Sequence, residues 1–181
     1  IQAQAFYPVR WAVAFLSQGH PLSARAYAAE TIAHLILTAW GAYGFFRRTA
    51  RDRAAAAFGA FAWGLSGYLT GYPLQDPPIV ASLAWLPWLL WGLAGLLEGA
   101  PHPGRWRALA ILAWAMTFLG GHTQTTLYVY LIALAFAGAQ LGARQAGRAR
   151  GARELARVIL LGTGLTAAPL LATLELIPWT E

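Results

Sequence analysis

Long apolar blocks separated by short polar loops dominate this chain of 181 residues. A transmembrane helix needs about 20 largely apolar residues, at 1.5 Å of rise each, to cross a hydrocarbon core of roughly 30 Å. The pattern therefore predicts an all-α fold, a polytopic transmembrane bundle of about six spans that forms one domain over residues 1–181. The predicted spans are 26–46, 54–70, 79–97, 106–120, 126–142 and 155–177.

The first apolar stretch, residues 6–16, is too short to be a span. Eleven helical residues reach only about 17 Å, which predicts an interfacial or re-entrant helix at the N-terminus. The chain begins at Ile1 without an initiator Met or a signal-peptide pattern. We therefore expect it to be a segment of a longer protein.

Residues 108–142 are apolar for too long to form one crossing, because a single helix of this length would run about 52 Å. The pair Gly120-Gly121, followed by the polar residues 122–125, supplies a break. We expect two antiparallel helices that turn at 120–125. Pro87 predicts a kink in the span 79–97, and Pro169 lies inside the last span.

The arginines fall on alternate loops. Eleven of the thirteen lie in the loops 47–53, 98–107 and 144–157, and the intervening loops 71–78 and 121–125 contain none. By the positive-inside rule, this distribution predicts a cytoplasmic location for the three basic loops in a bacterial inner membrane. The acidic residues and the histidine of those loops look like solvated charges: Asp52, Glu98, His102 and Glu154.

Composition supports the same class of protein. Hydrophobic residues make up 58% of the chain and charged residues 11%, against about 25% in soluble domains. The net charge of +6 does not indicate nucleic acid, because the arginines sit in short loops between apolar blocks. The absence of Cys excludes disulfides and thiolate metal sites. No metal-spaced His/Glu pair, phosphate-binding Gly loop or nucleophile elbow is found, so no metal or cofactor is expected.

The remaining polar residues gather on the predicted outer side. Ionisable groups inside a membrane are costly and usually face a bundle interior or a wet cavity. We expect five of these residues to line one shared outer cavity, with Arg10 or Arg25 at its rim: Glu30, His34, His122, Gln124 and Glu175. The full set of candidate substrate-binding residues is Arg10, Arg25, Glu30, His34, Asp76, His122, Gln124 and Glu175.

Each candidate also has a purely structural interpretation. His34 fits a hydrogen-bonded contact between helices, and Asp76 fits a turn role beside Pro77. The stripe Trp85, Trp88 and Trp91 is more typical of packing or lipid contact than of a sugar platform. The set as a whole suits an anionic, hydroxyl-rich ligand, since it mixes acids, His and Arg.

Several motifs in their order and spacing resemble the bacterial YfhO-like membrane protein family over nearly the whole chain. The segment 121–128, Gly-His-Thr-Gln-Thr-Thr-Leu-Tyr, looks like the family's Gly-His-Pro-Gln turn. The segment 171–176, Leu-Ala-Thr-Leu-Glu-Leu, is similar to its Pro-x-x-Glu-Leu helix end. Further similarities are Phe6-Tyr7-Pro8, His34 in the span ending at Arg47-Arg48, Gly64-Leu65-Ser66-Gly67-Tyr68 and Trp85-Leu86-Pro87.

This resemblance implies a membrane glycosyltransferase of the GT-C architecture, which transfers a sugar from a polyprenyl-phosphate carrier at the outer face. It also implies an acidic residue that acts as base or binds the acceptor. That residue would stand on an outer loop upstream of Ile1, so no catalytic residue is assigned. Arg10 or Arg25 would hold the carrier phosphate, and His34, His122 and Gln124 would hydrogen-bond sugar or phosphate. Glu175 would position a hydroxyl group or orient a partner Arg.

The alternative is a non-catalytic structural subunit of a larger membrane complex. The short length and the missing first outer loop favour this interpretation. In either case we expect membrane lipids as partners, with other membrane subunits in the second case and nucleic acid in neither. A transporter is less favoured, because no inverted repeat is evident.

The predicted topology can be tested by cysteine labelling, because the chain has no natural Cys. Ala50→Cys and Arg148→Cys should react only with reagents that reach the cytoplasmic side. Gln75→Cys and Thr123→Cys should react with an impermeant maleimide added outside intact cells. Labelling of position 148 from outside would overturn the orientation that the arginines indicate.

Overall fold

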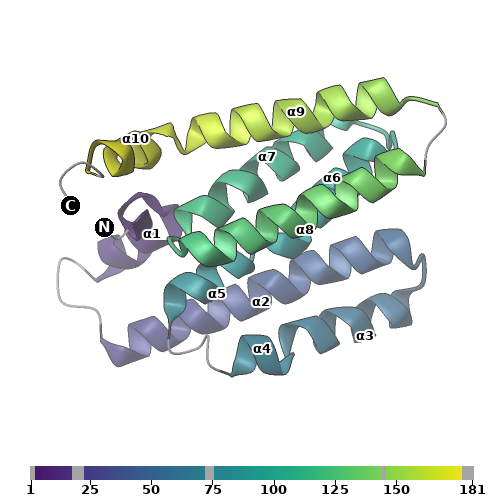
Figure 1. Cartoon of the computed structure of the whole chain (residues 1–181). Helices are drawn as coiled ribbons and strands as arrows, with labels where there is room; N and C mark the ends of the chain where they lie inside the picture. Colours follow the sequence, from purple (N-terminus) through teal and green to yellow (C-terminus); the bar gives the residue numbers. More distant parts are fainter. Residues whose placement is uncertain (1–2, 18–22, 72–75, 144–145, 177–181) are drawn as a thin grey trace.

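The computed structural model describes residues 3–17, 23–71, 76–143 and 146–176, with only the backbone of 172–176. Every regular element among these residues is a helix, which confirms the all-α prediction. A 3-10 turn at Ala3–Phe6 precedes ten helices in the described chain, shown in Figure 1: α1 Pro8–Leu16, α2 Ala24–Thr49, α3 Arg53–Gly64, α4 Gly67–Thr70, α5 Pro77–Leu83, α6 Leu86–Leu97, α7 Pro103–Leu119, α8 Thr123–Gly142, α9 Arg148–Leu165 and α10 Ala167–Leu176.

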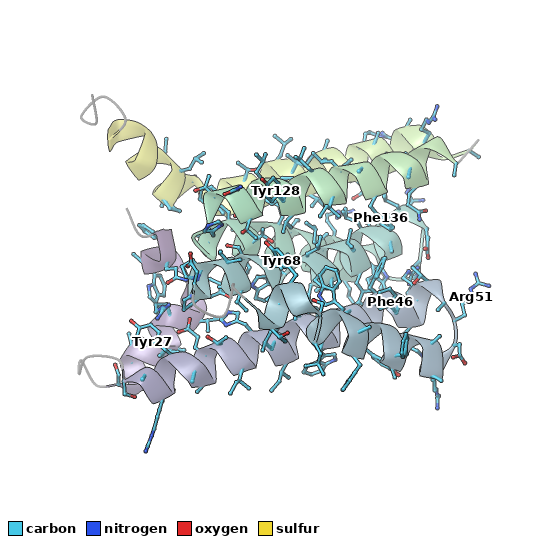
Figure 2. The ribbon with its side chains drawn as sticks, turned by 60° about the horizontal axis from the view of Figure 1, so that its bottom comes forward. Tyr27, Phe46, Arg51, Tyr68, Tyr128 and Phe136 are labelled. Carbon is cyan, nitrogen blue, oxygen red and sulfur yellow. The ribbon has the colours of Figure 1, made fainter. Side chains whose placement is uncertain are left out.

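The long helices lie side by side along one common direction (Figure 1). Helix α6 is central and contacts α2, α7, α8 and α9. The connections α2–α3, α6–α7 and α8–α9 meet at one end, which we call the arginine end. Helices α1 and α10 and the α7–α8 turn lie at the opposite end, which we call the α1 end. Figure 2 shows Arg51 and Tyr27 near these two ends, respectively.

The expected break within residues 108–142 is confirmed. Helix α7 ends at Leu119 and α8 begins at Thr123, with Gly120 and Gly121 in the turn. Gly121 has φ of 90°, a conformation that only Gly adopts without strain. Gly120 packs against Ser82 so closely that an added Cβ would lie 2.6 Å from the Ser82 amide nitrogen.

Three of the predicted spans are interrupted helices. The kink expected at Pro87 is present, since α5 ends at Leu83 and α6 begins at Leu86: Pro87 has no N–H to donate to the carbonyl of Leu83. The predicted continuous helices 54–70 and 155–177 are wrong in detail. Ser66 is extended between α3 and α4, and Thr166 separates α9 from α10, three residues before Pro169.

Tryptophans on α6 fill notches that glycines leave on α2. A Cβ at Gly41 would lie 2.5 Å from Trp88 Cδ1, and one at Gly44 would lie 2.5 Å from Trp91. The Trp88 indole also donates a 2.9 Å hydrogen bond to the carbonyl of Leu37. The tryptophan stripe is therefore packing between helices, as its structural interpretation predicted.

Polar and apolar faces are reversed relative to a soluble protein. On α2, Glu30, His34 and Thr38 recur every four residues and are buried in the bundle. The outward face of the same helix presents Ile32, Ile36 and Trp40 at 56%, 61% and 65% exposure. Large apolar side chains also cover the outer faces of other helices: Phe58 and Phe61 on α3, Leu127 and Leu131 on α8, and Leu160 and Leu165 on α9. Large exposed apolar patches are rare on monomers in water and mark interfaces with proteins or membranes.

Among the described residues, two helical segments are long and apolar enough to cross a membrane by length and composition. They are Pro77–Leu97, with a mean hydropathy of 1.7, and Thr123–Gly142, with a mean hydropathy of 1.4. The first is mostly buried by other helices, whereas the second is mostly exposed.

Ion pairs link the helices at the arginine end. Arg107 forms a bidentate pair with Glu154, at 2.7 and 3.0 Å, and Arg157 also contacts this carboxylate at 2.7 Å. Arg48 pairs with Glu98 at 2.8 Å. The expectation that Glu154 and Glu98 are merely solvated was therefore wrong, and the hydrogen bonds from Arg107 hold the pKa of Glu154 below its ordinary value.

The α2–α6 packing predicts unequal effects of two Gly→Ala changes. Gly41→Ala should lower the free energy of unfolding by about 1–3 kcal/mol, because its Cβ overlaps the Trp88 ring. Gly138→Ala on α8 has no atom within 4 Å of its new Cβ and should be neutral or stabilising by up to about 1 kcal/mol. Thermal unfolding in detergent measures both. Equal destabilisation by the two changes would contradict this packing.

Candidate functional site

A chain of hydrogen bonds at the α1 end ties three distant segments together. The Trp85 indole donates to the Tyr7 hydroxyl at 3.0 Å, and that hydroxyl lies 2.6 Å from His34 Nε2. His34 Nδ1 lies 2.8 Å from the carbonyl of Glu30. Donors and acceptors match throughout if Tyr7 donates to Nε2 and His34 carries its proton on Nδ1. Burial raises the pKa of the Tyr7 hydroxyl, so it stays a donor.

The carboxylate of Glu30 is balanced by one arginine. Arg10 Nη1 lies 3.1 Å from Glu30 Oε2, while Arg10 Nη2 donates to Gln4 at 2.7 Å. The Glu30 side chain is only 1% exposed, and its two oxygens make no hydrogen bond to any described residue. The ion pair therefore anchors α1 to α2, because a buried carboxylate without a counter-charge is strongly unfavourable.

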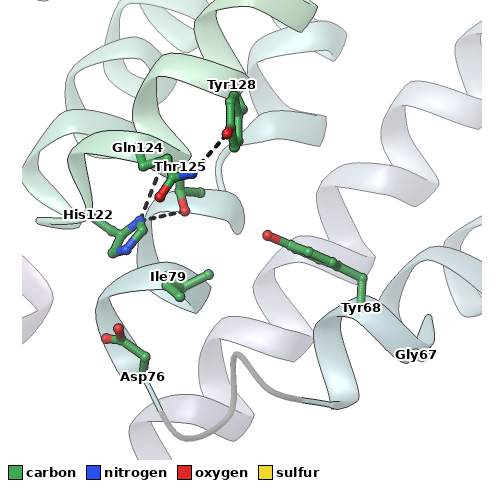
Figure 3. Close-up of a pocket in the computed structure, with 8 residues that line it drawn as sticks. All are labelled: Gly67, Tyr68, Asp76, Ile79, His122, Gln124, Thr125 and Tyr128. Carbon is green, nitrogen blue, oxygen red and sulfur yellow. Dashed lines mark hydrogen bonds between the residues drawn. The ribbon is translucent and has the colours of Figure 1, made fainter.

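A separate pocket of about 390 Å³ opens beside the α7–α8 turn (Figure 3). We call it the His122 pocket. Asp76 and His122 lie on one side of it, and the rings of Tyr68 and Tyr128 lie on the other. Its lining residues are Gly67, Tyr68, Asp76, Ile79, His122, Gln124, Thr125 and Tyr128.

His122 is fixed by its role as the N-cap of α8. Its Nδ1 accepts a 3.1 Å hydrogen bond from the Thr125 amide and lies 2.7 Å from the Thr125 hydroxyl. Because Nδ1 is an acceptor, the proton of the neutral ring is on Nε2. Gln124 donates to the Tyr128 hydroxyl at 2.8 Å, which orders the adjacent wall. The His122 ring thus offers a positioned donor, Nε2–H, to a ligand.

Asp76 occupies the N-cap position of α5, but its carboxylate does not cap the helix. The next two residues, Pro77 and Pro78, have no N–H, and the Ile79 amide donates instead to the Asp76 carbonyl at 3.0 Å. The side chain makes no hydrogen bond or ion pair to any other described residue. The predicted turn role therefore does not account for the carboxylate, which has no partner among the described residues.

Asp76 also borders a second pocket of about 430 Å³, which we call the Arg10 pocket. Gln4, Arg10 and Tyr27 line its other sides. The Arg10 guanidinium lies over the Tyr27 ring, 5.3 Å from its centroid. One carboxylate therefore stands between the His122 pocket and the Arg10 pocket.

The structure divides the predicted site residues instead of placing them in one cavity. Asp76, His122 and Gln124 share the His122 pocket, whereas Glu30 and His34 are buried in the hydrogen-bonded and ionic network. Arg10 links the two groups, because it pairs with Glu30 and lines a pocket with Asp76. Arg25 is exposed on the first turn of α2, and the side chain of Glu175 lies outside the described residues. The expectation of a single shared cavity was therefore wrong for Glu30 and His34.

Sequence reasoning missed the aromatic members of both groups. Tyr7 is fully buried and bonds to His34 and Trp85, yet those residues are 27 and 78 positions away. Tyr68 and Tyr128 line the His122 pocket from α4 and α8. The available signal was weak: each of these tyrosines stands within a motif that supported the family resemblance.

Comparisons with known proteins identify no relative of this chain. No family model matches it, and neither a curated protein nor a solved structure is significantly similar. The resemblance to the YfhO-like family therefore depends on the motifs alone.

The buried network predicts the effect of removing one oxygen atom. Tyr7→Phe should lower the free energy of unfolding by about 1–3 kcal/mol, because it leaves the Trp85 N–H and His34 Nε2 without a partner in the protein interior. Tyr43→Phe is the matched control, since Tyr43 is 36% exposed on the same bundle. Chemical denaturation in mixed micelles measures the difference. A Tyr7→Phe protein as stable as the control would exclude the proposed hydrogen bonds.

Proposed function

We propose that the chain is a multi-pass membrane protein that crosses an inner membrane about six times. The reversed polarity of α2 supports this, because a polar stripe turned inward and an apolar stripe turned outward suit a lipid environment. The apolar outer faces of α3, α8 and α9 extend the argument to helices other than the two most apolar segments. The basic loops meet at one end, so the arginine end is proposed to be cytoplasmic.

We propose further that the protein is a glycosyltransferase-like enzyme acting at the outer face. The observation that supports this most directly is the chemistry of the His122 pocket. A carboxylate, an imidazole N–H, an amide and two phenol rings surround it, and arginine is absent from its described lining. Such a set recognises a neutral, hydroxyl-rich group by hydrogen bonds and by contact with aromatic faces.

The proposed donor is a sugar on a polyprenyl-phosphate carrier, with the phosphate in the Arg10 pocket. Arg10 uses Nη1 towards Glu30 and Nη2 towards Gln4, so its other N–H groups remain for a phosphate oxygen. Glu30 reduces the net charge offered to the ligand, yet it also holds the guanidinium in place. Arg25 is less suited to this role, since it is exposed on the first turn of α2.

A second candidate function is a non-catalytic structural subunit of a membrane complex. The network of Tyr7, His34 and Trp85 favours it, because these polar groups satisfy one another and need no ligand. Unlike this network, the carboxylate of Asp76 and Nε2 of His122 lack partners among the described residues. These unsatisfied groups are the reason that we prefer a ligand-binding function.

The enzyme proposal predicts turnover of a lipid-linked sugar. The purified protein in vesicles should consume at least one of the polyprenyl-phosphate-linked sugars glucose, galactose, mannose and N-acetylglucosamine, followed as radiolabel leaving the donor. His122→Ala should reduce the rate by about tenfold or more, because it removes a donor to the ligand. His102→Ala, at the exposed α6–α7 connection, should leave it unchanged. Failure of the wild type with the whole panel would favour the structural subunit.

A further inference from the structure

The His122 pocket continues into an apolar groove. A hollow of about 780 Å³ runs between α3 and α8, and we call it the α3–α8 groove. Its walls include Phe46, Ala62, Leu86, Val129 and Ile132. Tyr68, Thr125 and Tyr128 line both the groove and the His122 pocket. In Figure 2, Phe46 lies further than Tyr68 towards the arginine end, so the groove extends from the polar pocket into the bundle's length.

The Arg10 pocket has an apolar neighbour of its own. A hollow of about 630 Å³ follows the first turns of α2, lined by Ala24, Ala28, Ile32 and Leu35, and we call it the α2 groove. Tyr27 and Pro77 line both this groove and the Arg10 pocket. Each polar pocket therefore adjoins an apolar groove, and together they form an amphipathic site. Asp76 lines both polar pockets.

Two polar pockets that each adjoin an apolar groove match the polar head and apolar chain of two amphiphiles. A groove in a membrane-embedded bundle is filled by hydrocarbon at little cost, whereas a polar head requires matched hydrogen-bonding groups. The Arg10 pocket, beside the α2 groove, offers an arginine to a lipid head that carries a phosphate. The His122 pocket, beside the α3–α8 groove, offers Asp76, His122 and Gln124 to a lipid head that has hydroxyl groups and no negative charge.

We propose that the acceptor is a hydroxyl-bearing membrane lipid whose chain lies in the α3–α8 groove, and that Asp76 takes the proton from its hydroxyl. This inference rests on the proposed glycosyl transfer. In that step the acceptor oxygen forms a bond to the anomeric carbon, and the bond from that carbon to the phosphate oxygen breaks. The lipid phosphate leaves with the bonding electron pair, and the hydroxyl proton moves to the Asp76 carboxylate. Asp76 is distinct from the acidic residue that the family resemblance places upstream of Ile1.

The acceptor class can be tested with a matched pair of probes. The full protein is placed in phosphatidylcholine vesicles with the radiolabelled donor on which it is active. Either dioleoylglycerol or glycerol is then added, which offer the same kind of hydroxyl with and without hydrocarbon chains. Label should appear in a neutral glycolipid with dioleoylglycerol and should not be transferred to glycerol at equal concentration.

Three tryptophan variants separate the two grooves. Ala62→Trp fills the α3–α8 groove and should raise the KM for dioleoylglycerol about tenfold, without changing the KM for the donor. Ala28→Trp fills the α2 groove and should do the reverse. Ala57→Trp is the control, because Ala57 is exposed on α3 away from the groove and both KM values should stay the same. Asp76→Asn should lower kcat about 100-fold or more at unchanged thermal stability.

Each outcome bears on a different claim. Transfer to glycerol or water in place of the lipid overturns the proposed acceptor while the enzyme proposal stands. An unchanged KM for dioleoylglycerol in Ala62→Trp overturns the assignment of the groove. Activity of Asp76→Asn close to wild type overturns its role as base. If the wild type consumes no donor, the proposed function itself fails and this inference fails with it.

Discussion

The rest of the structure depends on one constraint: polar side chains on these helices must find their partners inside the bundle. The outer faces present Phe, Leu, Ile and Trp, so a Glu, His or Thr that faces inward needs a partner on another residue of the bundle. Helix α2 meets the constraint by placing Glu30, His34 and Thr38 on one buried face, where Arg10, Tyr7 and Trp63 reach them. This is why a short helix at the N-terminus is held firmly against the long helices.

Local signals in the sequence predicted the long helices and two of their breaks, but not the interruptions at Ser66 and Thr166. Apolar block length, Gly120-Gly121 and Pro87 act through backbone geometry within a few residues, so they predicted the α7–α8 turn and the break between α5 and α6. Contacts between distant segments were beyond such signals. Nothing near Tyr7 indicates that it will meet Trp85, and nothing near Glu154 indicates the bidentate contact with Arg107.

Asp76 shows how a site residue can be misjudged from its neighbours. An Asp beside Pro favours a turn, and the turn is present. However, the cap that usually occupies such a side chain needs an amide at the second or third helical position. Pro78 removes the first of these amides, and the Ile79 amide bonds to the backbone carbonyl. The two consecutive prolines were readable in the sequence as a sign that this carboxylate would not cap α5.

The two histidines among the predicted site residues differ in whether each ring nitrogen has a hydrogen-bond partner in the protein. His34 has a partner on each ring nitrogen, and both partners belong to the protein, so its contribution is to join the start of α1 to α2. His122 uses one nitrogen as an N-cap and presents the other without a partner among the described residues. The two histidines lie at the same end of the bundle but differ in their hydrogen-bond partners. We therefore propose that ligand binding at the α1 end involves His122 and Asp76, whereas His34 and the ion-paired Glu30 hold the helices together.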